Sequence, residues 1–96
     1  MLRPFFTVII PIFNRAYCIE RCLKSVEMCL ETGSFEVVLV DDGSKDNSVD
    51  IVKSFINEKA EYKLIRLSSN MGVNTARNEA IAAATGDWLI FLDSDD

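Results

Sequence analysis

The chain has 96 residues, about half of them apolar (49%), a net charge of −5 and no histidine. This length suffices for one domain, and the apolar content predicts a packed core rather than disorder. The acidic balance argues against nucleic acid as a partner. A small phosphate ligand stays compatible with it, because a divalent cation can bridge carboxylates to phosphate.

Apolar runs alternate with helical patterns along the chain. Strands are predicted over residues 5–13 (FFTVIIPIF), 35–42 (FEVVLVDD), 62–67 (YKLIRL) and 88–93 (WLIFLD). Helices are predicted over residues 18–30, 49–60 and 73–86, the last two separated by the third strand. Strands that are almost continuously apolar are typical of a parallel sheet buried on both faces, so an α/β fold in three layers is expected.

The N-terminus and the cysteines bear on location. The opening stretch, MLRPFFTVIIPIF, is a poor signal peptide and is too short to span a bilayer. Cys18, Cys22 and Cys29 fall in one predicted helix, and no histidine is available to complete a zinc site. We therefore expect reduced cysteines that pack a helix in a cytoplasmic protein.

Ligands of open parallel sheets bind beyond the carboxyl ends of the strands. The segments there are PIFNR, DDGS, SSNMG and DSDD. Neither the glycine-rich fingerprint of dinucleotide-binding folds nor a P-loop follows the first strand. A phosphate ligand must therefore be held by something other than a glycine cradle.

Paired carboxylates follow the second strand. Asp41 and Asp42 precede Gly43, and such residues favour turns and helix caps. The alternative is that one carboxylate accepts hydrogen bonds from the N–H or hydroxyl groups of a ligand. The sequence alone leaves both interpretations open.

A second acidic cluster, Asp93, Asp95 and Asp96, follows the fourth strand. Carboxylates this close repel one another, and a hard divalent cation such as Mg²⁺ or Mn²⁺ relieves the repulsion. A solvated acidic segment is the alternative.

Three further residues have two interpretations each. Phe13 could stack on a base or pack in the core, and Asn14 could face the ligand or form a turn. Arg77 could pair with phosphate or with a carboxylate at the strand ends, or lie on a solvated helix face.

Three segments together resemble the N-terminal half of the inverting family 2 glycosyltransferases, which have the GT-A fold: TVIIPIFNR, VVLVDDGSKDNS and NMGVNTARNEAIAAATGDWLIFLDSDD. The likeness runs from Thr7 to Asp96. It implies a three-layer α/β/α fold with a mostly parallel sheet in the strand order 3-2-1-4. It also implies that residues 1–96 form one partial domain, the donor-binding half of a longer enzyme.

The resemblance implies transfer of a sugar from a nucleotide-diphosphate sugar to a saccharide or lipid-linked acceptor, in the cytoplasm or peripherally at the inner face of the membrane. The implied nucleotide-binding residues are Pro11, Phe13, Asn14, Asp41, Asp42, Arg77 and Asp93. The implied ligands of Mg²⁺ or Mn²⁺ are Asp93, Asp95 and Asp96. Phe13 stands where many members carry Tyr, so stacking is kept and a hydroxyl is lost.

In this family the catalytic base is a carboxylate well beyond the D-x-D motif, which is Asp93 and Asp95 here. No residue up to Asp96 is therefore expected to be the base, and the piece alone is expected to be inactive. It is also expected to self-associate through residues 88–93, an apolar edge strand. The alternatives are a non-catalytic nucleotide-binding or interaction module and a metal-dependent nucleotidyltransferase.

Overall fold

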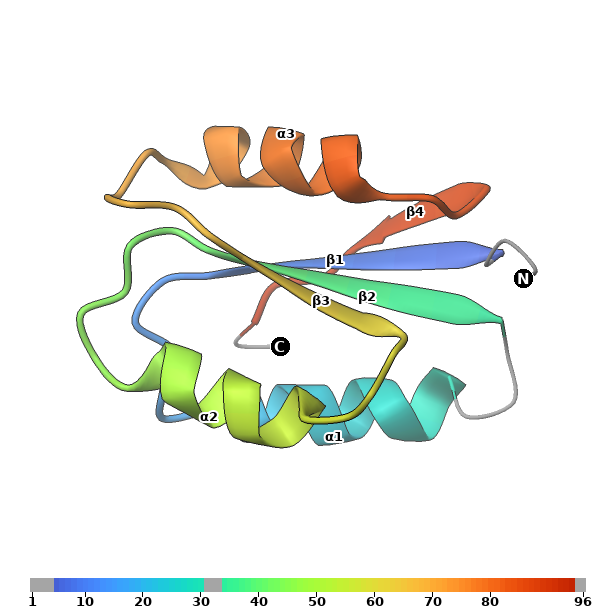
Figure 1. Ribbon diagram of the computed structural model, residues 1–96, viewed down its shortest axis with the longest axis horizontal. Coiled ribbons are helices and arrows are strands. Elements are labelled where there is room, and N and C mark those ends of the chain that lie inside the picture. The colour runs from blue at the N-terminus through green and yellow to red at the C-terminus, as the bar shows by residue number, and fades with distance from the viewer. Residues whose placement is uncertain (1–4, 31–33, 95–96) are drawn as a thin grey trace.

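The computed structural model describes residues 5–30 and 34–94, in which strands and helices alternate (Figure 1). The strands are β1 (Phe6–Ile12), β2 (Phe35–Asp41), β3 (Tyr62–Arg66) and β4 (Trp88–Phe91). The helices are α1 (Ile19–Leu30), α2 (Ser48–Ile56) and α3 (Val73–Ala83). Each predicted element is present. Helix α3 ends before the expected Gly86, because Ala84 is extended, with φ −73° and ψ 141°.

The four strands form one parallel sheet in the order β3-β2-β1-β4, which confirms the predicted order 3-2-1-4. In its register Ile10 lies opposite Leu39 on β2, and Val8 lies opposite Ile90 on β4. Helices α1 and α2 cover one face and α3 covers the other, so the domain has three layers (Figure 1). The segments after β1, β2 and β3 and the start of α3 therefore meet at one edge of the sheet.

Side chains alternate between the two faces along each strand and build two cores. The core below α1 and α2 contains Val8, Ile10, Ile12, Ile19, Cys22, Leu23, Val26, Val37, Leu39, Val52 and Tyr62. The core below α3 contains Ile9, Val38, Val40, Ala76 and Ala80. Cys18 and Cys22 are buried, in agreement with the packing role expected for them, and the side chain of Cys29 lies outside the described part.

Strand β4 differs from the expectation that the strands are buried on both faces. Its four side chains are exposed, from 39% for Leu89 to 61% for Trp88. The reason is that α3 packs on β1 and β2, whereas β4 lies at the edge of the sheet beside β1. The prediction of burial on both faces is therefore wrong for β4, whereas its expected position as an edge strand agrees with the sheet order.

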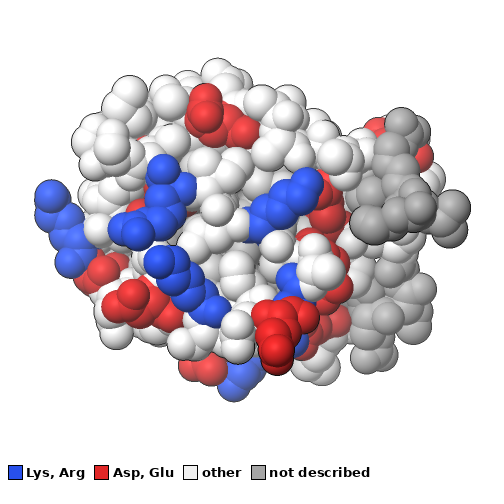
Figure 2. Space-filling model, in the orientation of Figure 1, with Lys and Arg blue, Asp and Glu red and all other residues white. Residues whose placement is uncertain are grey.

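Acidic and basic side chains are interspersed on the face of the molecule shown in Figure 2. Among residues 5–30 and 34–94, no helix is both long enough and apolar enough to cross a bilayer.

Candidate functional site

The loop after β1 is fastened to the loop after β2. Asn14 has a positive φ of 53°, which Asn tolerates better than most residues. Its amide donates to Ser44 Oγ at 2.8 Å, and its Oδ1 accepts from the amide of Lys45 at 2.7 Å. The amide of Arg15 donates to Ser48 Oγ at 2.8 Å. Asn14 thus forms the turn that its alternative interpretation predicted, and it holds Phe13 in place beside β2.

The two carboxylates after β2 have different surroundings. Asp41 is buried; its Oδ2 accepts from the amide of Ser44 at 3.0 Å, and its Oδ1 has no hydrogen-bond partner among the described residues. Asp42 Oδ1 accepts from the amide of Met71 at 2.6 Å, and Oδ2 accepts from the amide of Gly72 at 3.0 Å. Asp41 therefore closes its own turn, whereas Asp42 holds the segment that leads into α3.

Gly43 allows the loop after β2 to approach the loop between β3 and α3. Its φ is +81°, and a Cβ placed there would lie 2.7 Å from the amide nitrogen of Asn70. Any side chain at this position would be strained and would push the β3–α3 loop away. Glycine is therefore required where the sequence DDGS predicts a sharp turn.

The segment after β4 contacts α3 and the residue that precedes α1. Arg77 Nη2 lies 3.8 Å from Asp93 Oδ1, and its guanidinium lies 5.8 Å from the centre of the Phe91 ring. The Asp93 side chain is 61% exposed, so this ion pair is weak. Cys18 Sγ donates to the carbonyl oxygen of Ser94 at 3.5 Å. Arg77 thus meets a carboxylate at the strand ends, one of the two partners expected for it.

A pocket of about 260 Å³ opens where these loops meet. Its lining consists of Pro11, Ile12, Phe13, Arg15, Asp42, Val73, Ala76, Asp93 and Ser94. Phe13 is 37% exposed at its wall, so its ring is accessible rather than sequestered in the core. An aromatic ring and two carboxylates are therefore brought together from three strand ends.

Four of the predicted site residues line this pocket: Pro11, Phe13, Asp42 and Asp93. Asn14 and Arg77 are not among the lining residues; Asn14 contacts the loop after β2, and Arg77 contacts the lining residue Asp93. Asp41 lines a neighbouring hollow instead, together with Lys45 and Arg66. Asp95 and Asp96 lie outside the described residues.

The structure adds Arg15 to the candidate residues. Its side chain lines the pocket, and its Nη1 donates to the carbonyl oxygen of Phe13 at 3.0 Å. The only sequence indication was its position in PIFNR, directly after a strand. One basic residue in a loop is usually solvated, so that indication was weak.

The glycosyl transferase family 2 profile matches residues 7–96, nearly the whole chain. The chain belongs to glycosyl transferase family 2. It is 41% identical over 98 aligned positions to the PGL/p-HBAD biosynthesis glycosyltransferase of Mycobacterium bovis, covering all of this chain and 37% of that relative. The family 2 domain described here thus spans a little over a third of that relative's length.

Solved structures of family 2 relatives share the fold. S. aureus TarS in complex with UDP-GlcNAc superposes with a TM-score of 0.86 at 36% identity, over 95% of this chain and 26% of TarS. The mannosyltransferase PcManGT of Pyrobaculum calidifontis, in complex with GDP-Man and Mn²⁺, superposes with a TM-score of 0.84 at 30% identity, over 99% of this chain and 28% of PcManGT. The domain has the GT-A fold predicted from the sequence.

The edge of the pocket offers a hard cation one accessible carboxylate. Asp93 presents an exposed carboxylate whose contact with Arg77 is long, at 3.8 Å. Mg²⁺ typically takes one or two protein carboxylates and completes its shell with water and phosphate oxygens. Within residues 5–30 and 34–94 there is no group of three metal-ligating side chains, so a site with three protein ligands would have to include residues outside this part of the chain.

Proposed function

We propose that this domain binds the nucleotide-diphosphate sugar of a glycosyltransferase that moves the sugar to a saccharide or lipid-linked acceptor. The observation that carries the proposal is the pocket at the carboxyl end of the sheet, in a family 2 domain, lined by Phe13, Asp42 and Asp93. The structures of TarS and PcManGT contain UDP-GlcNAc and GDP-Man, which are donors of this class.

The nucleoside end of the donor is proposed to lie against Phe13 and Pro11. An exposed aromatic ring offers a stacking surface for any base. Asp42 supports this placement because it lines the pocket, whereas its neighbour Asp41 does not. Asp42 accepts two backbone amides, and a carboxylate has further lone-pair positions for a base N–H or a ribose hydroxyl. Asp41 is proposed to maintain the turn beside it.

The diphosphate end is proposed to lie near Asp93, with Asp95 and Asp96 as further ligands of Mg²⁺ or Mn²⁺. A bound cation would supply charge neutralisation for the leaving diphosphate. Arg77 already faces Asp93, and it would keep a positive charge beside the phosphates. The PcManGT complex contains Mn²⁺ together with GDP-Man, which supports a divalent cation of this kind.

We propose an inverting single displacement, in which the acceptor hydroxyl attacks the sugar as the nucleotide diphosphate leaves. No described residue other than Asp42 and Asp93 brings a carboxylate to this pocket. Both are assigned to the donor, and Asp95 and Asp96 are assigned to its cation, so the base is proposed to lie outside the 96 residues. The chain alone is therefore expected to bind the donor without transferring the sugar.

The edge strand β4 is proposed to mediate self-association of this chain. Its exposed apolar side chains and its free edge can pair with the same strand of a second copy.

Calorimetric titration with UDP and GDP, with and without Mn²⁺, tests the donor site. Mn²⁺ should tighten binding to the wild-type chain about tenfold or more, and Asp93→Asn should remove most of that gain. Asp50→Asn is the matched control, because it removes an equal charge from an exposed position on α2. Equal affinity with Mn²⁺ and with a chelator would contradict the metal role, and no binding of either nucleotide would contradict the site.

A further inference from the structure

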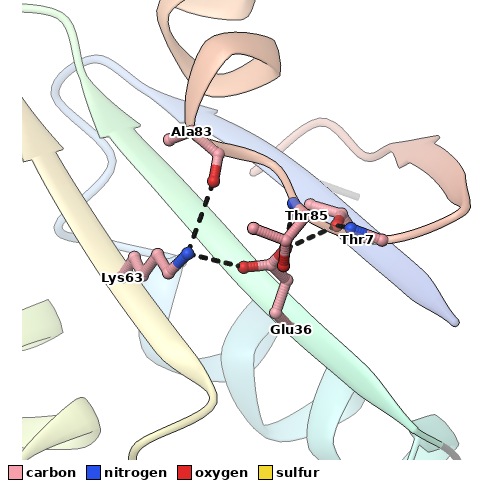
Figure 3. A network of polar contacts seen from close by, with 6 residues as sticks. Thr7, Glu36, Lys63, Ala83 and Thr85 are labelled. Atoms are coloured by element: carbon pink, nitrogen blue, oxygen red, sulfur yellow. Dashed lines mark hydrogen bonds and ion pairs between the residues drawn. The ribbon is translucent and has the colours of Figure 1, made fainter. Parts of the chain in front are cut away.

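The opposite end of the sheet contains a polar cluster that the proposed donor site does not use (Figure 3). Glu36 on β2 is 4% exposed, and its Oε2 accepts from Thr7 Oγ1 at 2.8 Å and from Thr85 Oγ1 at 2.6 Å. The amide of Thr85 donates to the same oxygen at 2.5 Å. Lys63 Nζ lies 3.0 Å from Oε1 and 3.4 Å from the carbonyl oxygen of Ala83.

The charge on Glu36 is favoured by these donors. Burial alone would raise the pKa of this carboxyl, but the hydrogen bonds from Thr85, Lys63 and Thr7 outweigh burial and lower the pKa from 4.5 to about 2. A carboxylate with several charge-assisted hydrogen bonds holds its partners more firmly than a neutral group would. Those partners come from β1, β3 and the connection between α3 and β4.

The same cluster fixes the entry to β4. The Thr7 hydroxyl that donates to Glu36 also accepts from the amide of Gly86 at 2.9 Å. A Cβ on Gly86 would lie 2.6 Å from Thr7 Oγ1 and 2.7 Å from Thr7 N. The chain therefore enters β4 in direct contact with the backbone of β1, at a distance that only glycine allows.

Strand β4 is otherwise joined to the sheet by its backbone ladder to β1, and Arg77 contacts Phe91 and Asp93 near its end. All of its side chains are exposed, and its ladder to β1 ends with the amide of Leu92, which donates to the carbonyl oxygen of Ile9 at 3.0 Å. Asp93 follows directly. A slip of one residue would turn each side chain of a strand to the other face of the sheet, and Asp93 would then leave the pocket.

We propose that Glu36 and Thr7 are positioning residues for the donor site: through Thr85 and Gly86 they set the register of β4 and so place Asp93. This inference rests on the proposed function only for the role of Asp93, since the register itself is independent of any ligand. Neither residue lines the pocket.

Two variants of Thr7 separate the hydroxyl from packing. Thr7→Val keeps the volume of this buried residue and removes the hydroxyl, whereas Thr7→Ser keeps the hydroxyl and removes a methyl group. Hydrogen exchange measured by NMR on the full chain reports on β4 through two amides: that of Trp88 donates to the carbonyl oxygen of Phe5, just before β1, and that of Leu92 donates to Ile9 on β1. The amide of Leu67, which donates to Asp41 O on the β2–β3 side, is the internal control.

In Thr7→Val the exchange of Trp88 and Leu92 should accelerate about tenfold relative to Leu67, because a hydrogen bond to a charged group is lost. In Thr7→Ser the exchange of Trp88 and Leu92 relative to Leu67 should change by less than about threefold. Equal acceleration of all three amides, or a larger effect in Thr7→Ser, would overturn the fastening role of the hydroxyl.

A second readout addresses the placement of Asp93. In Thr7→Val the gain in UDP or GDP affinity caused by Mg²⁺ should fall, while affinity without metal should stay near that of wild type, because Asp42 belongs to the β2 side of the pocket. Selective loosening of β4 with an unchanged metal-dependent gain would overturn the positioning role. If the wild-type chain binds no nucleotide, the proposed function fails, and the exchange ratios still decide whether the cluster sets the register.

Discussion

The carboxylates at the two ends of the sheet differ in burial and in their hydrogen-bond partners. At the amino end, Glu36 is buried and every partner comes from another part of the fold. At the carboxyl end, Asp93 is 61% exposed and its contact with Arg77 is long. Asp42 is buried but still lines an open pocket. A carboxylate whose hydrogen bonds are all made within the protein stabilises the fold, whereas one with unused capacity at a pocket is available to a ligand.

The largest contrast in stability is expected from adding the same methyl group at each end. Gly86→Ala should lower the free energy of unfolding by about 3 kcal/mol, because the new Cβ meets the backbone of β1, which cannot move aside. Gly43→Ala, with φ +81° and a contact to an exposed loop, should cost about 1–2 kcal/mol. Urea unfolding measures both values. A greater loss in Gly43→Ala would reverse the comparison.

Acid should weaken the amino end of the sheet through Glu36. Because the pKa of Glu36 is lowered from 4.5 to about 2, its contribution to stability is complete above pH 4.5 and is lost as the pH falls toward 2. The difference corresponds to roughly 3 kcal/mol, and screening of Lys63 by water brings the expected loss to about 2 kcal/mol. Unfolding free energies measured across this range should fall more steeply in wild type than in Glu36→Gln. Parallel profiles would contradict the account.

Substitutions at the carboxyl end of the sheet should change nucleotide binding rather than stability. Phe13→Ala should weaken nucleotide binding about tenfold, the effect of losing a stacking surface, and Phe13→Tyr should retain wild-type affinity. Both variants should unfold within about 1 kcal/mol of wild type, since the ring is already 37% exposed. Calorimetry and thermal unfolding check the two statements separately. Unchanged affinity in Phe13→Ala would place the base elsewhere.

The smallest effect on stability is expected along β4. Ile90→Lys should change the unfolding free energy by about 0.5 kcal/mol or less, because the side chain is 40% exposed, yet it should reduce self-association by charging the edge. Sedimentation at micromolar concentration measures this. Met28→Lys, at a 76% exposed position on α1, is the matched control and should leave association unchanged. A wild-type chain that is monomeric would refute pairing through β4.

The sequence allowed the sheet order and part of the pocket to be predicted, because periodicity identifies the strands and ligands of parallel sheets lie beyond their carboxyl ends. Phe13, Asp42 and Asp93 were found for this reason. The edge position of β4 was expected, but the exposure of all four of its side chains was not, since WLIF has the composition of a buried strand and the cover of this strand depends on where α3 packs.

The Glu36 cluster could not be predicted from the sequence either. Its partners Thr7 and Thr85 lie 29 and 49 residues away along the chain, and a glutamate within FEVVLV shows nothing of them. The different roles of Asp41 and Asp42 also required coordinates. Adjacent residues of a strand point to opposite faces, and the pocket lies on the side of Asp42.

The central claim is that the carboxyl end of this sheet binds a nucleotide diphosphate. NMR titration of the ¹⁵N-labelled chain with UDP or GDP and Mg²⁺ tests it most directly. The account predicts shifts of the amides near Phe13, Asp42, Gly72 and Asp93, with those near Glu36 and Thr85 unchanged. Shifts centred on the amino end, or no shifts at millimolar nucleotide, would contradict it.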